Sequence, residues 1–291
     1  MADALTTLTE LLELLLVPIL IAELVWLRRR RDLTWARVKE MLANASSFIF
    51  LVAGAVLGAV VWVGLFEWVA GALPWSIPTN VGTAILAVLL ADFIYYWEHR
   101  FEHEHRLPWD LYHSVHHSSE QFDQTTSLRL GFFDGLLTFG YSLPLVIVGF
   151  SPTLVLAATA LVVGYQTWIH TELITKLPQW FEAIFNTPSH HRAHHGADEH
   201  YLDVNYGGIL IIWDRMFGTF QPETNRPEYG LTTQIESSNP LDVQFSQLRL
   251  LARDLRQDRS WRTRLTRLWK HPGWSPEEDR PHALATGAYD R

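Results

Sequence analysis

Apolar stretches long enough to cross a lipid bilayer constrain this chain more than any other feature of its sequence. A transmembrane helix needs about 20 mostly apolar residues to cross a hydrocarbon core about 30 Å thick. Five stretches approach that length, at about residues 5–27, 46–70, 81–97, 132–150 and 152–169. The last two are joined by Ser151 alone, which indicates a helical hairpin. We therefore predict an all-α integral membrane protein with about four or five transmembrane helices.

The positions of the basic residues predict which side of the membrane each loop faces. Between the first two stretches lie Arg28, Arg29, Arg30, Arg31, Arg37 and Lys39, and short loops rich in Lys and Arg stay in the cytoplasm. Counting from there, residues 71–80 and the tip near Ser151 fall outside, and neither carries a Lys or Arg. The sequence thus predicts a multi-pass protein of the plasma or inner membrane. Residues 98–131 and 170–221 would form a cytoplasmic helical cap.

Three carboxylates leave a soluble helical protein open as the alternative. Glu10, Glu13 and Glu23 lie within the first apolar stretch. A charged side chain is costly in lipid unless it faces the interior of a helix bundle. The first stretch is therefore an imperfect transmembrane segment.

Charge and cysteine content exclude several classes of function. The formal net charge is −8, whereas nucleic-acid binding requires a basic surface that neutralises phosphates. The chain has no cysteine, which excludes disulfides, zinc ribbons and thiol nucleophiles. Any metal must be bound by imidazole and carboxylate groups.

The spacing of the histidines is the strongest functional signal. Of the 14 histidines, all except His271 and His282 lie between positions 99 and 200. They include one pair four residues apart and two His-x-x-His-His triplets: His99 and His103; His113, His116 and His117; His191, His194 and His195. Residues at i, i+3 and i+4 share one face of a helix. Nine or so converging imidazoles exceed what one ion can use, so we infer a two-metal site.

The residue types narrow the chemistry without identifying the substrate. A catalytic zinc site normally has three protein ligands and an open position. Soluble di-iron bundles instead use Glu-x-x-His motifs, which are not the pattern here. The histidine set therefore favours a redox-capable pair of metal ions at the membrane surface.

The histidines belong to longer motifs between about residues 80 and 221. These are Asp92-Phe93-x-Tyr95-Tyr96-Trp97-x-His99-Arg100-x-x-His103, Trp109 to Val115-His116-His117-Ser118-Ser119, Trp168-Ile169-His170-Thr171-Glu172, Asn186-Thr187-Pro188-x-His190-His191-Arg192-x-His194-His195-Gly196, Asp203-x-Asn205-Tyr206-Gly207-Gly208, and Trp213-Asp214-Arg215-x-Phe217-Gly218-Thr219-Phe220. With these motifs the sequence resembles the fatty acid hydroxylase/sterol desaturase superfamily of membrane di-iron enzymes. The segment from Val115 to Glu120 and the residues from Thr125 to Arg129 are similar to the alkylglycerol monooxygenase-like branch. That branch cleaves ether lipids by hydroxylating the carbon beside the ether oxygen, with a pterin as reductant.

The resemblance implies a set of metal ligands. These are His99, His103, His113, His116, His117, His170, His191, His194 and His195, with His190 as a further candidate. Some members of the superfamily have another histidine four residues after the one that matches His170, whereas this chain has Ile174. His190 or Glu172 could complete the set instead. His105 and His200 match no motif, and we interpret them as surface residues.

Several other residues are candidates for supporting roles. Asp92, Glu104, Glu172, Asp203 and Asn205 could orient the ligands by hydrogen bonding, although a helix cap at Glu104 and a turn at Asp203 and Asn205 are alternatives. Near the membrane surface, the candidate substrate-binding residues are Tyr96, Trp97 and Trp168. The alternative for these aromatic side chains is the ordinary interfacial belt of a membrane protein.

The predicted function is hydroxylation of a C–H bond of a lipid, which would be a fatty acyl, sterol, isoprenoid or ether lipid. The resemblance implies two iron ions, O2 as co-substrate, and electrons from a pterin or a separate electron-transfer protein. Two alternatives remain open at this point. One is a desaturase with the same di-iron site, and the other is a zinc hydrolase or a metal-binding membrane protein without turnover.

The chain divides into three regions on these patterns. Residues 1–80 would form N-terminal transmembrane helices, residues 81–221 the catalytic domain, and residues 222–291 a cytoplasmic tail. Within the tail, residues 246–270 are basic and amphipathic. They would lie either on the anionic inner leaflet or against the cap as an ordinary solvated helix.

Overall fold

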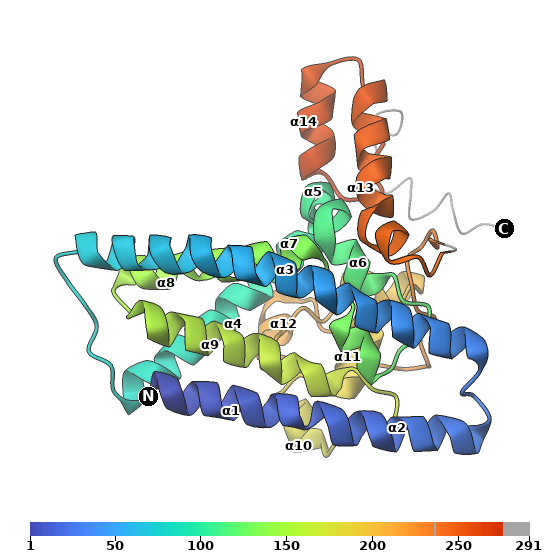
Figure 1. Ribbon diagram of the computed structural model, residues 1–291, viewed down its shortest axis with the longest axis horizontal. Helices are drawn as coiled ribbons and strands as arrows, with labels where there is room; N and C mark the ends of the chain where they lie inside the picture. The colour runs from blue at the N-terminus through green and yellow to red at the C-terminus, as the bar shows by residue number, and fades with distance from the viewer. Residues whose placement is uncertain (236, 276–291) are drawn as a thin grey trace.

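The computed structural model describes residues 1–235 and 237–275, and in these ranges it is helical, with no β-strand (Figure 1). The long elements are α1 (Ala2–Leu14), α2 (Leu16–Arg30), α3 (Trp35–Ala72), α4 (Val81–Glu104), α9 (Pro152–Tyr165), α13 (Pro240–Gln257) and α14 (Trp261–Trp269). Shorter helices are α5 (Arg106–Pro108), α6 (Ser114–His117), α7 (Phe132–Leu137), α8 (Leu143–Val148), α10 (Gln179–Glu182), α11 (Pro188–His194) and α12 (Ile212–Phe217). The prediction of an all-α protein is confirmed.

Among the described residues, three helices are long and apolar enough to cross a membrane. They are α3, α4 and the segment Pro152–Ile169, in which α9 continues into a 3₁₀ turn. The other two predicted stretches are interrupted. Residues 5–27 divide at Leu15 into α1 and α2, and residues 132–150 divide into α7, a 3₁₀ turn (Thr138–Ser142) and α8. Apolar composition alone does not reveal such breaks, because each fragment still reads as apolar.

Small residues let the helices approach one another closely. A Cβ atom at Gly54 of α3 would collide with the main-chain carbonyl of Phe132 in α7, and one at Gly135 would collide with the carbonyl of Leu51. Small residues at such contacts are typical of helices that pack within membranes. On the other side of the bundle, Ala87 and Ala91 of α4 belong to a buried core that α9 completes.

The three carboxylates of the first stretch have different environments. Glu10 and Glu13 are exposed, whereas Glu23 is buried. The Glu23 carboxylate accepts hydrogen bonds from the main-chain N–H of Gln124 at 2.6 Å and from the Thr171 hydroxyl at 2.6 Å. Glu23 therefore faces the protein interior and connects α2 to the loops that surround the histidines.

The C-terminal helices α13 and α14 form a hairpin that stands across the direction of α3 and α9 (Figure 1). The base of this hairpin is fixed to the bundle by Phe245, whose ring meets that of Phe50 in α3 edge-on at 6.3 Å between centroids. Residues 246–270 were predicted to be one amphipathic segment. The structure instead bends the chain after Gln257 into two helices.

Candidate metal centre

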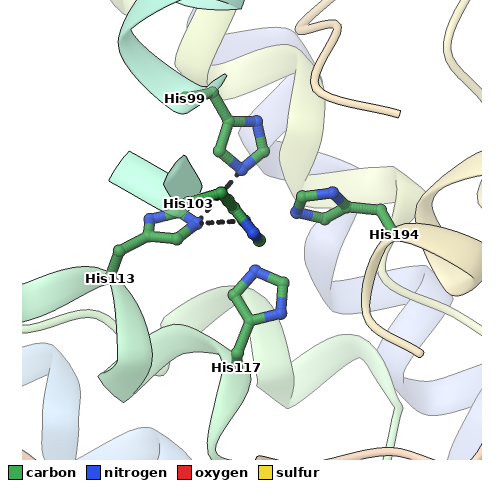
Figure 2. Close-up of side chains that lie close together, drawn as sticks. All are labelled: His99, His103, His113, His117 and His194. Carbon is green, nitrogen blue, oxygen red and sulfur yellow. Dashed lines mark hydrogen bonds between the residues drawn. The ribbon is translucent and has the colours of Figure 1, made fainter. Parts of the chain in front are cut away.

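In the part of the chain that the structure describes, nine buried histidines converge in two groups. The five-histidine group contains His99, His103, His113, His117 and His194, and the four-histidine group contains His116, His170, His191 and His195. Within each group the potential ligand atoms lie within 4.8 Å of one another. Figure 2 shows the five-histidine group, in which the rings point toward a common centre.

Each His-x-x-His-His triplet contributes to both groups. In the first triplet, His113 and His117 belong to the five-histidine group and His116 to the other. In the second, His194 belongs to the five-histidine group while His191 and His195 belong to the other. The spacing suggested that the rings of each triplet converge on one metal ion. In the structure the rings of each triplet instead divide between the two adjacent groups. This arrangement places the two groups side by side.

Local helix geometry delivers these rings. His99 and His103 lie one turn apart on α4. A π-helical turn at Trp109–His113 precedes α6, and π-helical turns inside helices are frequent at functional sites. Pro188 begins α11, as proline favours the first turn of a helix. The second triplet therefore starts in a fixed register.

Main-chain carbonyls hold the outward-facing nitrogens of four rings. The Nδ1 atoms donate to carbonyls as follows: His99 to Tyr206 at 2.9 Å, His116 to Arg129 at 3.3 Å, His170 to Gln166 at 2.8 Å and His194 to Val204 at 2.8 Å. A carbonyl can only accept a hydrogen bond, so each of these Nδ1 atoms carries a hydrogen. In a neutral imidazole the Nε2 atom then has a free lone pair, which is the form that binds a metal ion.

A carboxylate holds a fifth ring. Glu102 lies 3.0 Å from the Nδ1 atom of His113, and both side chains are buried. A carboxylate that accepts from a ligating imidazole fixes its orientation and raises its basicity. Glu102 was not among the sequence candidates, because only tertiary packing decides which of the neighbouring carboxylates on α4 faces the His113 ring.

The inward-facing nitrogens provide the test of whether these residues fit a metal ion. The Nε2 atoms of His99 and His113 lie 3.1 Å apart, and those of His116 and His170 lie 3.2 Å apart. With their Nδ1 hydrogens engaged outside, neither pair of neutral rings has a hydrogen to share between its Nε2 atoms. Ligand nitrogens about 2.1 Å from one ion stand roughly 3 Å apart when they meet it at a right angle. A cation at each group would satisfy both lone pairs, so the donor sets fit two metal ions.

Burial keeps the imidazoles neutral. It lowers the pKa of His170 to about 4 and that of His194 to about 3. Burial, reinforced by neighbouring imidazoles, also lowers the pKa of four others, namely His116, His117, His191 and His195. At neutral pH these rings are therefore uncharged and able to act as ligands.

His190 lies outside both groups. Its Nδ1 atom lies 3.2 Å from the Thr187 hydroxyl, and its ring packs edge-on against Phe220. It lines a separate cavity of about 510 Å³ together with Lys176 and Arg215. Burial lowers the pKa of His190 to about 4, but its ring faces away from its neighbour His191.

Two of the candidate supporting residues lie near the ligands or their loop. Asp203 lies 3.4 Å from the Nδ1 atom of His103 and 2.8 Å from Nε2 of His271. Asn205 accepts from the main-chain N–H of Gln221 at 2.9 Å and donates to the carbonyl of His190 at 3.0 Å. Both residues have φ near 58°, so they also form the turn that carries Val204 to His194.

The other three supporting candidates make contacts away from the rings. Asp92 accepts from the main-chain N–H groups of Ile209 and Leu210 and from the Trp213 ring. Glu104 pairs with Arg100, and Glu172 forms a two-pronged pair with Arg226. Asp92 therefore organises the loop whose Tyr206 carbonyl holds His99.

The three aromatic candidates differ in burial. Tyr96 is fully buried, and its hydroxyl hydrogen-bonds to Thr219 at 3.0 Å while its ring stacks on Phe217. Trp97 is 42% exposed, and Trp168 packs edge-on against Tyr165.

His105 packs against Phe101 and Trp269, and His200 packs on Tyr201. Neither histidine belongs to a ligand group.

A buried arginine connects the four-histidine group to α3. Arg129, whose carbonyl holds His116, is only 1% exposed. Its guanidinium donates to Glu40 at 2.6 Å and to Asn44 at 2.8 Å, and to the Ser118 hydroxyl at 2.9 Å. Arg129 belongs to one of the motifs on which the family resemblance rests. Its two partners on α3 lie more than 80 positions earlier, and no sequence pattern indicated that they contact Arg129.

The comparisons with known proteins agree with the resemblance drawn from the motifs. Residues 84–219 match the family model described as fatty acid hydroxylase. Alkylglycerol monooxygenases of Xenopus tropicalis and Homo sapiens are 40% and 38% identical to this chain over 208 residues, which is 72% of it. An ornithine lipid hydroxylase of Rhizobium tropici is 31% identical over 157 residues, 52% of this chain and 46% of that protein.

The aligned segment covers 45% of each of the two alkylglycerol monooxygenases, so the chain spans about half the length of these relatives. No solved structure matches it.

Proposed function

Because residues 84–219 belong to the fatty acid hydroxylase family, we propose that this chain is a membrane-bound oxygenase that hydroxylates a C–H bond of a lipid with O2. The five-histidine and four-histidine groups would each hold one iron ion. Electrons would come from a reductant outside the chain, either a pterin or an electron-transfer protein. Two irons bound in this way would supply the redox chemistry that activates O2 for attack on an unactivated C–H bond.

The observation that carries the proposal is the pair of facing lone pairs in each group. His99 with His113, and His116 with His170, are held by their outer nitrogens so that their Nε2 atoms meet about 3 Å apart. Such an arrangement is costly in a buried site unless a cation lies between the nitrogens. The buried set of neutral imidazoles would hold iron and exclude water from it.

The residues around the rings would keep the site rigid. The carboxylate of Glu102 fixes His113, and Arg129 anchors the carbonyl that fixes His116. Both supporting residues are connected to long apolar helices. Glu102 lies on α4, and Arg129 is hydrogen-bonded to α3. The metal centre would thus lie at one end of the transmembrane helices, on the cytoplasmic side by the charge rule.

A membrane lipid is the proposed substrate class. The relatives are named for alkylglycerols and for ornithine lipids, and α3 exposes large apolar side chains such as Ile49, Val56 and Val60. The higher identity to the alkylglycerol monooxygenases makes an ether-linked glycerolipid the first substrate to test. Hydroxylation beside the ether oxygen would give a hemiacetal, which breaks down to an aldehyde and a free hydroxyl.

The experiment is oxidation of an alkylglycerol in proteoliposomes loaded with ferrous iron, with a tetrahydropterin as reductant and ¹⁸O2 as oxidant. The proposal predicts aldehyde formation that requires both O2 and reductant. Formation of an alkene that has gained no ¹⁸O atom would instead identify a desaturase. Cleavage that proceeds without O2 would identify a hydrolase and contradict the proposal.

A further inference from the structure

Helix α14 carries an exposed apolar stripe that the proposed oxygenase does not explain. Trp261, Leu265 and Trp269 are 66%, 48% and 58% exposed. They are spaced four residues apart, so they lie along one face of the helix. Two exposed tryptophans give this nine-residue helix a large apolar surface. Such surfaces usually mark a contact with a protein, a membrane or a ligand.

The stripe faces away from the rest of the hairpin. Arg267 points the other way, because its guanidinium binds Asp258 at 2.7 and 2.9 Å and approaches Asp254 of α13 at 3.8 Å. Each helical residue advances about 100°, so the stripe is centred roughly 160° around the helix from Arg267. The α13–α14 contact therefore uses one face of α14, and the tryptophans project from the opposite face.

Two aromatic contacts place the hairpin at the end of the apolar helices. Phe245 of α13 meets Phe50, which lies near the start of the apolar part of α3. Trp269 of α14 meets Phe101 near the end of α4, with ring centroids 6.0 Å apart. In Figure 1, α14 forms the side of the hairpin nearer to the apolar, C-terminal end of α3, with its axis transverse to that of α3. The stripe thus faces the side on which the bilayer would lie.

The charges beside the stripe complement a phospholipid surface. Residues 261–270 contain no Asp or Glu, and Arg262, Arg264 and Lys270 are exposed. The Arg262 guanidinium lies 5.5 Å above the Trp261 ring. Basic side chains next to tryptophan are typical of helices that lie in the headgroup region of an anionic membrane.

We propose that α14 lies flat on the bilayer crossed by α3 and α4, with its tryptophan stripe in the headgroup region of an anionic leaflet. The proposal goes beyond the proposed oxygenase. It rests on the membrane location of the apolar helices and not on the metals. An unloaded protein therefore tests it as well as an active one does.

Because the chain has no cysteine, a single nitroxide label can report on the stripe. We would label Leu265→Cys and, as a control, Arg256→Cys on an exposed position of α13, in vesicles of phosphatidylcholine and phosphatidylglycerol. The proposal predicts a severalfold higher ratio of oxygen to nickel-chelate collisions at position 265 than at position 256. Equal exposure to the water-soluble nickel chelate would overturn it, as would spin–spin broadening from a second copy of the chain.

The lipid charge distinguishes a membrane contact from a protein contact. In vesicles of phosphatidylcholine alone, the collision ratio at position 265 should fall, because the basic side chains lose their attraction to the surface. A label that stays shielded to the same degree whatever the lipid charge would mean that protein covers the stripe, and the proposal would be wrong.

Discussion

The Nε2 atoms of His116 and His170 face each other at 3.2 Å although the Nδ1 atom of each ring is bonded to a main-chain carbonyl. This relationship fixes the tautomer of both rings and leaves two lone pairs opposed in a buried site. A bound cation resolves the conflict. The same relationship recurs at His99 and His113, where Tyr206 and Glu102 hold the outer nitrogens.

Replacing Glu102 should weaken metal binding without unfolding the protein. Glu102→Gln keeps the shape of the side chain but removes the charge that supports His113. We expect metal affinity to fall about 10- to 100-fold, as is typical when the partner of a ligating histidine is lost. Competition with a chromophoric chelator measures the change. The control is Glu104→Gln, two positions further along α4 and on its more exposed side. This variant should bind metal as the unmodified protein does.

Removing the Arg129 side chain should destabilise the protein strongly. Arg129→Met leaves Glu40 without its buried partner and Ser118 without its donor. Breaking a buried ion pair on one side costs about 3–5 kcal/mol of unfolding free energy. Thermal unfolding in detergent measures the loss. Arg249→Gln breaks an ion pair whose members are 56% and 40% exposed, and should cost less than about 1 kcal/mol. Similar losses in the two variants would contradict the role assigned to Arg129.

A methyl group at Gly54 should disturb the packing of α3 against α7. The added Cβ would meet the Phe132 carbonyl, a main-chain atom that cannot move aside without the helix. We expect Gly54→Ala to lower the unfolding free energy by about 1–3 kcal/mol. Gly64→Ala on the same helix has open space around it, so it should be neutral or stabilising by up to about 1 kcal/mol. If both substitutions stabilise the protein, the close approach is absent.

The metal-free protein should lose stability as the pH falls below about 6.5, the usual pKa of histidine. The unfolded chain then binds protons that the folded state refuses, since burial lowers the pKa of His170 to about 4 and that of His194 to about 3. Stability therefore falls as the pH drops from about 6.5 toward 4. Thermal unfolding between pH 7.5 and 5, before and after chelation, measures the effect. A metal-free protein that is equally stable across this range would contradict burial of neutral rings.

Much of the architecture is predictable from the sequence because long apolar runs have few alternatives. Residues 46–70 and 81–97 lie in α3 and α4 as expected. The break at Leu15 is marked in the sequence by Pro18, which has no N–H to donate to the Leu14 carbonyl, but the apolar length of the stretch does not reveal it. The turn within residues 132–150 likewise contains Gly140 and is followed by Pro144, although the fragments on both sides of it are apolar.

Spacing singled out eight of the nine histidines of the site and the family resemblance added His170, but neither predicted how they divide between two groups. His116 and His117 are adjacent in sequence and face different groups, because successive helical residues point about 100° apart. The same rotation turns His190 away from His191. Glu102 and the Arg129 partners Glu40 and Asn44 depend on which helix faces meet, which only tertiary packing decides.

The metal content of variants at two adjacent histidines tests most directly whether the chain binds two metal ions. Protein loaded anaerobically with ferrous iron would be washed and assayed for iron and zinc beside His194→Ala and His195→Ala, which alter different groups. The two-ion account predicts two irons per chain in the unmodified protein and a loss of iron in each variant, with different Mössbauer signals remaining. One zinc per chain and no retained iron, unchanged in both variants, would contradict it.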